Sequence, residues 1–194
     1  LKEVSKNGLA GSALNVLSRQ LMSATNGASP SQSQLNTLLE HYQSGRYNDA
    51  EKLAISITEQ FPHHQFSWKV LGVMLKKTGR ISEGLIASQK AVGLAPQDAE
   101  AHNNLGSTLQ DLGRSKDAEA SCRKAIALKP DFVEAHYNLG NALQDLGRLE
   151  EAEASYRQAI SLKPDYAKAH SNLGITLRDL GRLEEAEASY RQAI

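Results

Sequence analysis

One fixed interval recurs through most of this sequence and limits the folds it can adopt. The phrase AHNNLGSTLQDLGR begins at Ala101, AHYNLGNALQDLGR at Ala135 and AHSNLGITLRDLGR at Ala169, so the three copies are evenly spaced. Glycines and prolines keep the same interval: Gly45, Gly79, Gly113, Gly147 and Gly181, then Pro62, Pro96, Pro130 and Pro164. Self-similarity at a period of about 34 residues is typical of stacked repeat units. We therefore expect five repeats, at 31–64, 65–98, 99–132, 133–166 and, incomplete, 167–194.

Each unit carries the pattern of two helices. In 99–132 the apolar residues fall three or four positions apart, in one set before Gly113 and a second set after it. Glycine adopts the left-handed conformation that ends a helix, and Pro130 cannot continue the second helix. Asp131 and Glu134 fit a capping box for the helix that follows. The sequence thus predicts an all-α solenoid of stacked antiparallel helix pairs.

Small residues recur inside the predicted helices. Gly72, Gly106, Gly140 and Gly174 lie within the first helix of successive units. Glycine in a helix interior costs about 1 kcal/mol relative to alanine. A cost repeated in four units predicts close packing against the second helix, where the facing position carries Ala50, Ala118, Ala152 and Ala186.

The composition excludes several classes of function. The 22 Lys and Arg residues balance 22 Asp and Glu residues, so the basic excess typical of nucleic-acid binding is missing. No segment approaches the roughly 18 apolar residues of a membrane span. The single cysteine, Cys122, cannot form an internal disulfide, so no oxidising compartment is needed. We expect a cytoplasmic protein that binds neither nucleic acid nor membrane.

The two ends of the chain differ from the repeats between them. Residues 1–30 are expected to form either a helix that caps the first repeat or a degenerate extra repeat, followed by a loop. The final helix, from Glu184 to Ile194, is a near copy of the segment from Glu150 to Ile160, which should pack on the following repeat. We therefore expect the natural protein to continue with further repeats, with or without another domain, and we expect the present chain to self-associate through the exposed face of this helix.

No catalytic or metal-binding constellation emerges from the sequence. His102, His136 and His170 recur once per unit, and stacked units should separate them by about 10 Å, too far to share one ion. The sequence has no P-loop, no G-x-S-x-G and no H-E-x-x-H. Since catalysis needs a unique convergence of groups, we predict no enzymatic activity, no metal and no cofactor.

Several of these motifs resemble one known repeat family. The tetratricopeptide pattern W-x2-L-G-x2-Y, A-x3-F and P is resembled by Trp68, Leu71 and Gly72 in one unit and by Ala152, Tyr156 and Pro164 in another. The resemblance covers residues 31–194. It implies a right-handed superhelix in which the first helix of each pair lines a concave groove, and it implies a protein or an extended peptide as the partner.

The asparagines suggest how such a groove could hold a peptide. Asn36, Asn104, Asn138 and Asn172 occupy the same slot of the first helix, where asparagine has no helix preference. An amide can pair with a backbone N–H and C=O together. With units about 10 Å apart and an extended chain rising about 3.3 Å per residue, each amide would meet every third residue. The alternatives are that the asparagines form inter-helix hydrogen bonds or that they recur only because the repeats arose by duplication.

The resemblance also indicates which neighbours of the asparagines face the groove. Besides the four asparagines, the predicted peptide-binding residues are Lys69, Asn103, Tyr137, Asn141, Gln110, Gln144, Asp111, Asp145 and Asp179. The phrase NLGN at Asn138–Asn141 is similar to the repeat arm of O-linked N-acetylglucosamine transferases. The leading hypothesis is a protein- or peptide-binding scaffold; the alternative is the substrate-recruiting arm of a larger enzyme such as a glycosyltransferase.

Overall fold

A computed structural model of the protein describes residues 29–193. Within this range the chain forms ten helices and no strand, so the all-α expectation is confirmed. The helices are α2 Gln32–Gln43, α3 Tyr47–Gln60, α4 Gln65–Lys77, α5 Ile81–Leu94, α6 Ala99–Asp111, α7 Ser115–Leu128, α8 Val133–Asp145, α9 Leu149–Leu162, α10 Ala167–Asp179 and α11 Leu183–Arg191. The capping helix or degenerate repeat expected within residues 1–30 lies outside the described residues, apart from Ser29 and Pro30, and so does Ile194.

The chain divides into two compact units, one ending at Ser67 and the other beginning at Trp68. In the first, α2 and α3 pack together through side chains that are fully buried, among them Leu38, Ala54 and Ile57. A capping box opens α2, because the Gln34 N–H donates to Ser31 Oγ and the Ser31 N–H donates to Gln34 Oε1. Both bonds satisfy backbone N–H groups that the start of a helix leaves unpaired.

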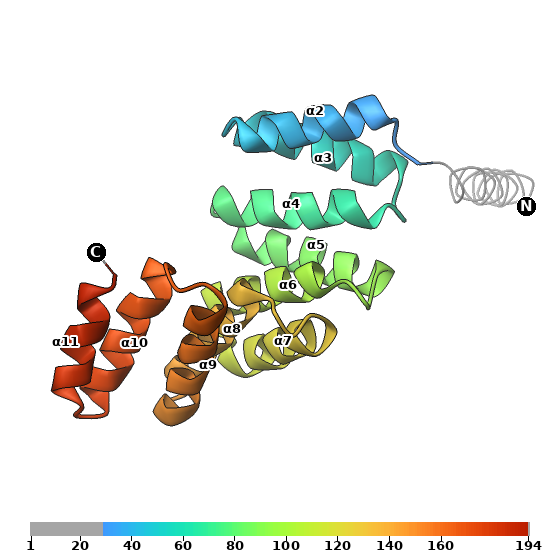
Figure 1. The fold of residues 1–194 in the computed structure, drawn as a ribbon. Helices are drawn as coiled ribbons and strands as arrows, with labels where there is room; N and C mark the ends of the chain where they lie inside the picture. Colours follow the sequence, from blue (N-terminus) through green and yellow to red (C-terminus); the bar gives the residue numbers. More distant parts are fainter. Residues whose placement is uncertain (1–28, 194) are drawn as a thin grey trace, which may run out of the picture. The chain divides into compact units, whose positions relative to one another are not determined.

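In the second unit each helix from α5 to α10 packs against the helix that follows it in the sequence. The pairs α6–α7, α8–α9 and α10–α11 are joined by contacts of α7 with α8 and of α9 with α10 (Figure 1). The first helices also meet one another, α6 with α8 and α8 with α10. A continuous core includes Leu143 of α8, Tyr156 of α9 and Leu177 of α10, each 1% exposed or less. Stacking of this kind buries an apolar surface that no helix pair could bury alone.

The turn inside each helix pair ends in a left-handed glycine. At Gly147 φ is 71°, and its N–H donates to Gln144 O, while the next N–H, of Arg148, donates to Leu143 O. Glycine adopts this conformation without a Cβ clash, so the turn can reverse the chain within a few residues. The other glycines with positive φ occupy the same place in their pairs: Gly45, Gly79, Gly113 and Gly181.

The capping box expected at Asp131 and Glu134 is wrong. Helix α8 has Phe132 as its N-cap residue, and no side chain caps it. In the preceding repeat the acid comes one residue later, at the position that Phe132 occupies before α8. There Asp98 caps α6 by accepting from the Ala101 N–H at 3.1 Å. A capping side chain reaches only the second or third N–H of its helix, so a shift of one residue removes the cap.

The expected close contact between paired helices is confirmed, although its partner is different. A Cβ placed on Gly140 would lie 2.5 Å from the Tyr156 ring, and one on Gly106 would lie 2.7 Å from Cys122 Sγ. The predicted partner Ala118 contributes only its carbonyl oxygen, 3.3 Å from the Gly106 position. The glycine therefore makes room for the side chain one turn beyond the alanine.

Ion pairs close into a ring between successive second helices. Arg148 binds Glu119 of α7 and Glu151 of α9, both at 2.6 Å, and Arg123 of α7 binds the same two carboxylates. The next interface repeats this arrangement, which we call the ion-pair ring, with Arg182, Glu153, Glu185 and Arg157. Hydrogen bonds from Arg148 and Arg182 lower the pKa of Glu151 and of Glu185. On α5 the slots of Glu119 and Arg123 carry Leu85 and Gln89, which cannot form the ring.

Replacing Glu153 with alanine should lower the free energy of unfolding by about 2 kcal/mol, because two arginines would lose a shared carboxylate. The Glu153 side chain is only 13% exposed, so water would replace those bonds poorly. Glu187 fills the same slot of α11, is 67% exposed and pairs with Arg191 alone, so Glu187→Ala should cost no more than about 0.5 kcal/mol. Urea unfolding of dilute protein compares the two variants, and equal losses would mean that the ring contributes nothing.

Candidate functional site

A groove of about 520 Å³ runs across the first helices of the second unit. We call it the first-helix groove. Its lining comes from the end of α4, from α6, from α8 and from the start of α10: Lys76, Asn103, Asn104, Ser107, Gln110, Asp111, Glu134, Tyr137, Asn138, Asn141, Tyr166 and Lys168. Seven of the predicted binding residues are in this lining: Asn103, Asn104, Gln110, Asp111, Tyr137, Asn138 and Asn141.

Two of the recurring asparagines donate to side chains of the preceding repeat. Asn138 Nδ2 donates to Asn103 Oδ1 at 2.8 Å. Asn172 Nδ2 donates to Asn141 Oδ1 at 2.8 Å and to the Tyr137 hydroxyl at 3.2 Å. The inter-helix hydrogen bonds of the structural alternative are therefore present for these two residues. They fix each amide from its nitrogen side.

The oxygen side of the same two amides is open. Among the described residues, no side chain or backbone N–H donates to Oδ1 of Asn138 or Asn172. Neither oxygen is fully buried, since the buried side-chain atoms without a partner in residues 29–193 are limited to His41 Nδ1. Each amide thus presents a hydrogen-bond acceptor whose direction its neighbours have set.

The other two asparagines of this slot differ from Asn138 and Asn172. The structure gives Asn104 no side-chain hydrogen bond within residues 29–193, and the residue is half-buried in the groove wall. Asn36 belongs to the first compact unit and accepts a hydrogen bond from Gln32 Nε2 at 2.9 Å. Asn104, Asn138 and Asn172 therefore belong to the second compact unit, whereas Asn36 belongs to the first.

Tyr137 and Tyr166 line the groove, and Tyr156 contacts one of its amides. The Tyr156 hydroxyl lies 2.8 Å from both Asn141 Oδ1 and Gln144 Oε1, so it can donate to either. The Tyr137 ring lies 6.0 Å from the Tyr156 ring and 5.2 Å from the Tyr166 ring, centroid to centroid. Burial raises the pKa of Tyr156, and burial with Tyr137 and Glu134 raises the pKa of Tyr166 to about 12. The hydroxyls of Tyr156 and Tyr166 are therefore neutral near pH 7.

Most predicted charged residues are already paired within the chain. Lys69 binds Asp98 at 3.1 Å and Glu100 at 2.7 Å, Lys76 binds Asp111 at 2.9 Å, and Asp179 binds Arg178 at 2.8 Å. Asp145 contacts Gln110 at 3.3 Å and Ser115 at 3.4 Å, with no cation among its described partners. Pairing removes most of the acidic character that the three aspartates suggest, and the groove is polar rather than strongly charged.

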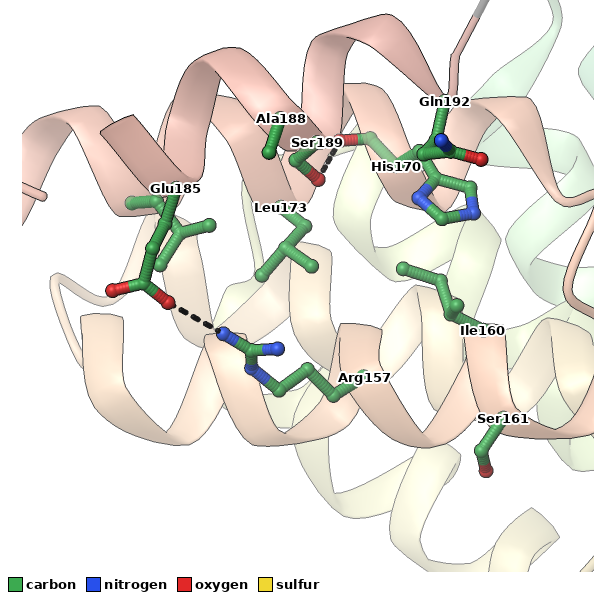
Figure 2. A pocket seen from close by; sticks show the side chains of 10 residues that line it. Arg157, Ile160, Ser161, His170, Leu173, Glu185, Ala188, Ser189 and Gln192 are labelled. Atoms are coloured by element: carbon green, nitrogen blue, oxygen red, sulfur yellow. Dashed lines mark hydrogen bonds and ion pairs between the residues drawn. The ribbon is translucent and has the colours of Figure 1, made fainter. Parts of the chain in front are cut away.

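A second hollow, of about 410 Å³, lies among α9, α10 and α11 (Figure 2). Leu173 and Ile160 line it, Arg157 binds Glu185 at 3.2 Å, and Ser189 Oγ donates to His170 O at 2.9 Å. The ring of His170 contacts Pro164 O at 2.8 Å. His102 and His136 make the same contact with Pro96 O and Pro130 O. The recurring histidines therefore bind their own loops, and in residues 29–193 no three His, Cys, Asp or Glu side chains gather as a metal ion would require.

A profile of the tetratricopeptide repeat matches residues 75–132, 103–165 and 137–194, which is more than half of the sequence. The chain belongs to the tetratricopeptide repeat family. In the tetratricopeptide pattern Tyr156 fills the aromatic slot of the second helix, and the structure shows that slot to be the one packed on the first-helix glycine. The resemblance to the repeat arm of O-linked N-acetylglucosamine transferases stays a prediction.

Several solved structures share this fold. MamA residues 41 to the end, from Desulfovibrio magneticus RS-1, gives a TM-score of 0.74 at 19% identity, over 84% of this chain and 92% of that chain. MamA AMB-1 gives 0.71 at 26% identity, over 81% and 94%. TTC0263, a thermophilic TPR protein in Thermus thermophilus, gives 0.70 at 24% identity, over 84% and 89%. A search of curated proteins found no significant match.

The family and fold matches identify a tetratricopeptide scaffold, an architecture consistent with protein interaction, and give no evidence of an enzymatic arm. No helix in the described part of the chain is both long enough and apolar enough to cross a lipid bilayer.

The predicted set lacks five lining residues of the first-helix groove: Lys76, Ser107, Glu134, Tyr166 and Lys168. Lys76 occupies the slot of Gln110 and Gln144, so the repeat alignment could have found it. Glu134, Tyr166 and Lys168 belong to the first turns of α8 and α10 or precede them, in a segment that varies between units. Five predicted residues besides Asn36 lie outside the lining: Lys69, Gln144, Asp145, Asn172 and Asp179.

Proposed function

We propose that the first-helix groove, together with Asn172, which donates to its lining residues Tyr137 and Asn141, binds an extended segment of a protein partner. The observation that carries the proposal is the pair of open Oδ1 atoms on Asn138 and Asn172, each held in place by hydrogen bonds on its nitrogen side. An acceptor that is fixed before binding loses little conformational freedom when a peptide N–H reaches it. Because every peptide unit except that of proline offers an N–H, such a row favours an extended backbone over a particular sequence.

Side chains between the amides would select among peptides. The groove has the hydroxyls of Tyr137 and Tyr166 and an amide on Gln110, while Lys76 and Asp111 neutralise each other. The other charged lining residues, Glu134 and Lys168, are one of each sign, so a partner rich in small and polar residues fits this lining better than one with a large excess of either charge. The full predicted set, Asn36, Lys69, Gln144, Asp145 and Asp179 included, remains part of the proposal.

We propose that residues 31–194 form five repeats with the bounds expected from the sequence and that residues 1–30 are a separate N-terminal segment. We also propose that the chain is a cytoplasmic binding protein, with protein partners and without catalysis or cofactor. The resemblance of NLGN at Asn138–Asn141 to the arm of O-linked N-acetylglucosamine transferases would add a catalytic domain outside this chain. That alternative uses the same groove, and the sequence of the complete natural protein decides it.

The triple variant Asn104→Ala, Asn138→Ala and Asn172→Ala should bind groove peptides at least about tenfold more weakly, since each lost hydrogen bond is worth about 0.5–1.5 kcal/mol. The probe is a fluorescent peptide selected on the wild-type chain from a random display library. Fluorescence anisotropy measures its affinity, and circular dichroism checks helicity. Asn48→Ala is the control, because Asn48 is exposed on α3 and outside the groove.

A single variant separates recognition from structure. Asn104 has no side-chain hydrogen bond in the described chain, so Asn104→Ala should weaken peptide binding while the unfolding midpoint stays unchanged. Selected peptides that compete with one another but bind the triple variant as tightly as the wild type would overturn the role of the asparagines.

A further inference from the structure

Helix α11 carries a copy of a surface that α9 uses to contact the next helix pair. On α9, Glu153 binds Arg182 at 2.6 Å, and Arg157 binds Glu185 at 3.2 Å. Glu187 and Arg191 stand one repeat further along, in the same slots of α11, and they bind each other. Among the described residues they have no other charged partner.

Exposure shows that this copy is unused within the described chain. The Glu187 and Arg191 side chains are 67% and 69% exposed, whereas that of Glu153 is 13% exposed. Leu183, one turn before Glu187, is 66% exposed, and its counterpart Leu149 is half-buried. We call Leu183, Glu187 and Arg191 the α11 stripe. It has the charges of half an ion-pair ring and an exposed apolar residue beside them.

The charges that would complete the ring are present at the start of the array. Arg46 and Asp49, just before and within the first turn of α3, occupy the slots that Arg182 and Glu185 occupy at α11. The local geometry is the same, since the Arg46 N–H donates to His41 O and the Arg182 N–H donates to Leu177 O, both at 2.9 Å. Arg46 binds the exposed Glu40 at 2.9 Å, and Asp49 is exposed with no ion pair in the described chain.

We infer that two copies of this chain associate head to tail, with the α11 stripe of one copy against the Arg46–Asp49 turn of the other. Arg46 donates to Glu187, Arg191 donates to Asp49, and Leu183 loses its exposure to water. The contact uses different surfaces on the two copies, so it does not close on itself, and it extends into open chains as the concentration rises. Because the pairs lie near the surface, added salt weakens the association.

Charge reversal tests this contact in the complete chain. Sedimentation velocity across a concentration series should show wild-type protein growing beyond a dimer at low salt and growing less at high salt. Glu187→Arg and Arg46→Glu should each weaken association by at least about tenfold, because like charges then face each other. The double variant carrying both changes should associate as the wild type does, since the two charges have exchanged places.

A matched control makes the same charge change beside the stripe. Glu184→Arg should leave association unchanged, because its counterpart Glu150 stays exposed even though α10 packs on α9. Circular dichroism verifies that each variant is folded. A wild type that stays monomeric at all concentrations overturns the proposal, as does a double variant no better than the single ones, because Glu187 would then not contact Arg46.

Discussion

Alanine in place of Gly140 is expected to lower the free energy of unfolding by about 2–3 kcal/mol, even though alanine is the better helix former. The added Cβ would lie 2.5 Å from Tyr156 Cε1 and 2.7 Å from Cδ1. The tyrosine cannot move aside easily, because its side chain is fully buried and its hydroxyl is hydrogen-bonded. Helices α8 and α9 must then separate, which opens the core on both sides. Urea unfolding followed by circular dichroism measures the loss.

Gly93→Ala is the matched control for this change. Gly93 also lies inside a helix, α5, but a Cβ there has nothing within 4 Å. This variant should be more stable than the wild type by up to about 1 kcal/mol, the ordinary helix preference of alanine over glycine. If both substitutions stabilised the protein, the glycine of the first helix would not be required by packing.

Truncation of Tyr156 to alanine should have the largest effect of any single change, a loss of about 3–5 kcal/mol. The side chain is among the fully buried groups, and its ring contacts the core shared by α7, α8, α9 and α10. Tyr156→Phe keeps the ring and removes only the hydroxyl, so it should cost about 1 kcal/mol. Thermal unfolding of the two variants separates the contribution of the ring from that of the hydrogen bond.

The two sites should also be coupled. In the Tyr156→Ala background the Gly140→Ala change no longer meets a ring, so it should become neutral or stabilising. Additive losses in the double variant would show that the Gly140 substitution acts through something other than Tyr156.

Removing the Tyr156 hydroxyl should also affect the first-helix groove. Asn141 Oδ1 accepts from Tyr156 and also from Asn172, so the core and the proposed peptide site share one amide. Tyr156 therefore helps to position one amide of the proposed peptide site.

The sequence predicted those features that depend on local backbone requirements. The left-handed turns at Gly113, Gly147 and Gly181 follow from the residue type, because few other residues adopt a positive φ without strain. The close helix approach at Gly106 and Gly140 follows in the same way. The constant spacing of the repeats then placed each such feature in successive units.

Features that depend on the register between units could not be predicted. The hydrogen bond from Asn138 to Asn103 joins residues 35 apart, and only the stacking of α8 on α6 decides that they meet. The ion-pair ring likewise needs Arg148 to reach across to Glu119 of another helix pair. The expected cap at Asp131 was wrong for a smaller reason, a shift of one residue before α8.

Because Cys122 packs against Gly106, chemical modification of its thiol can detect the separation of α6 from α7. Its thiol is 0% exposed, and burial raises its pKa to about 12, so neither a reagent nor a base can reach it while α6 and α7 remain together. It is the single cysteine of the sequence. The rate at which a thiol reagent modifies the native protein therefore measures how often these two helices separate. A peptide that binds the first-helix groove and holds α6 in place would lower this rate without touching the sulfur.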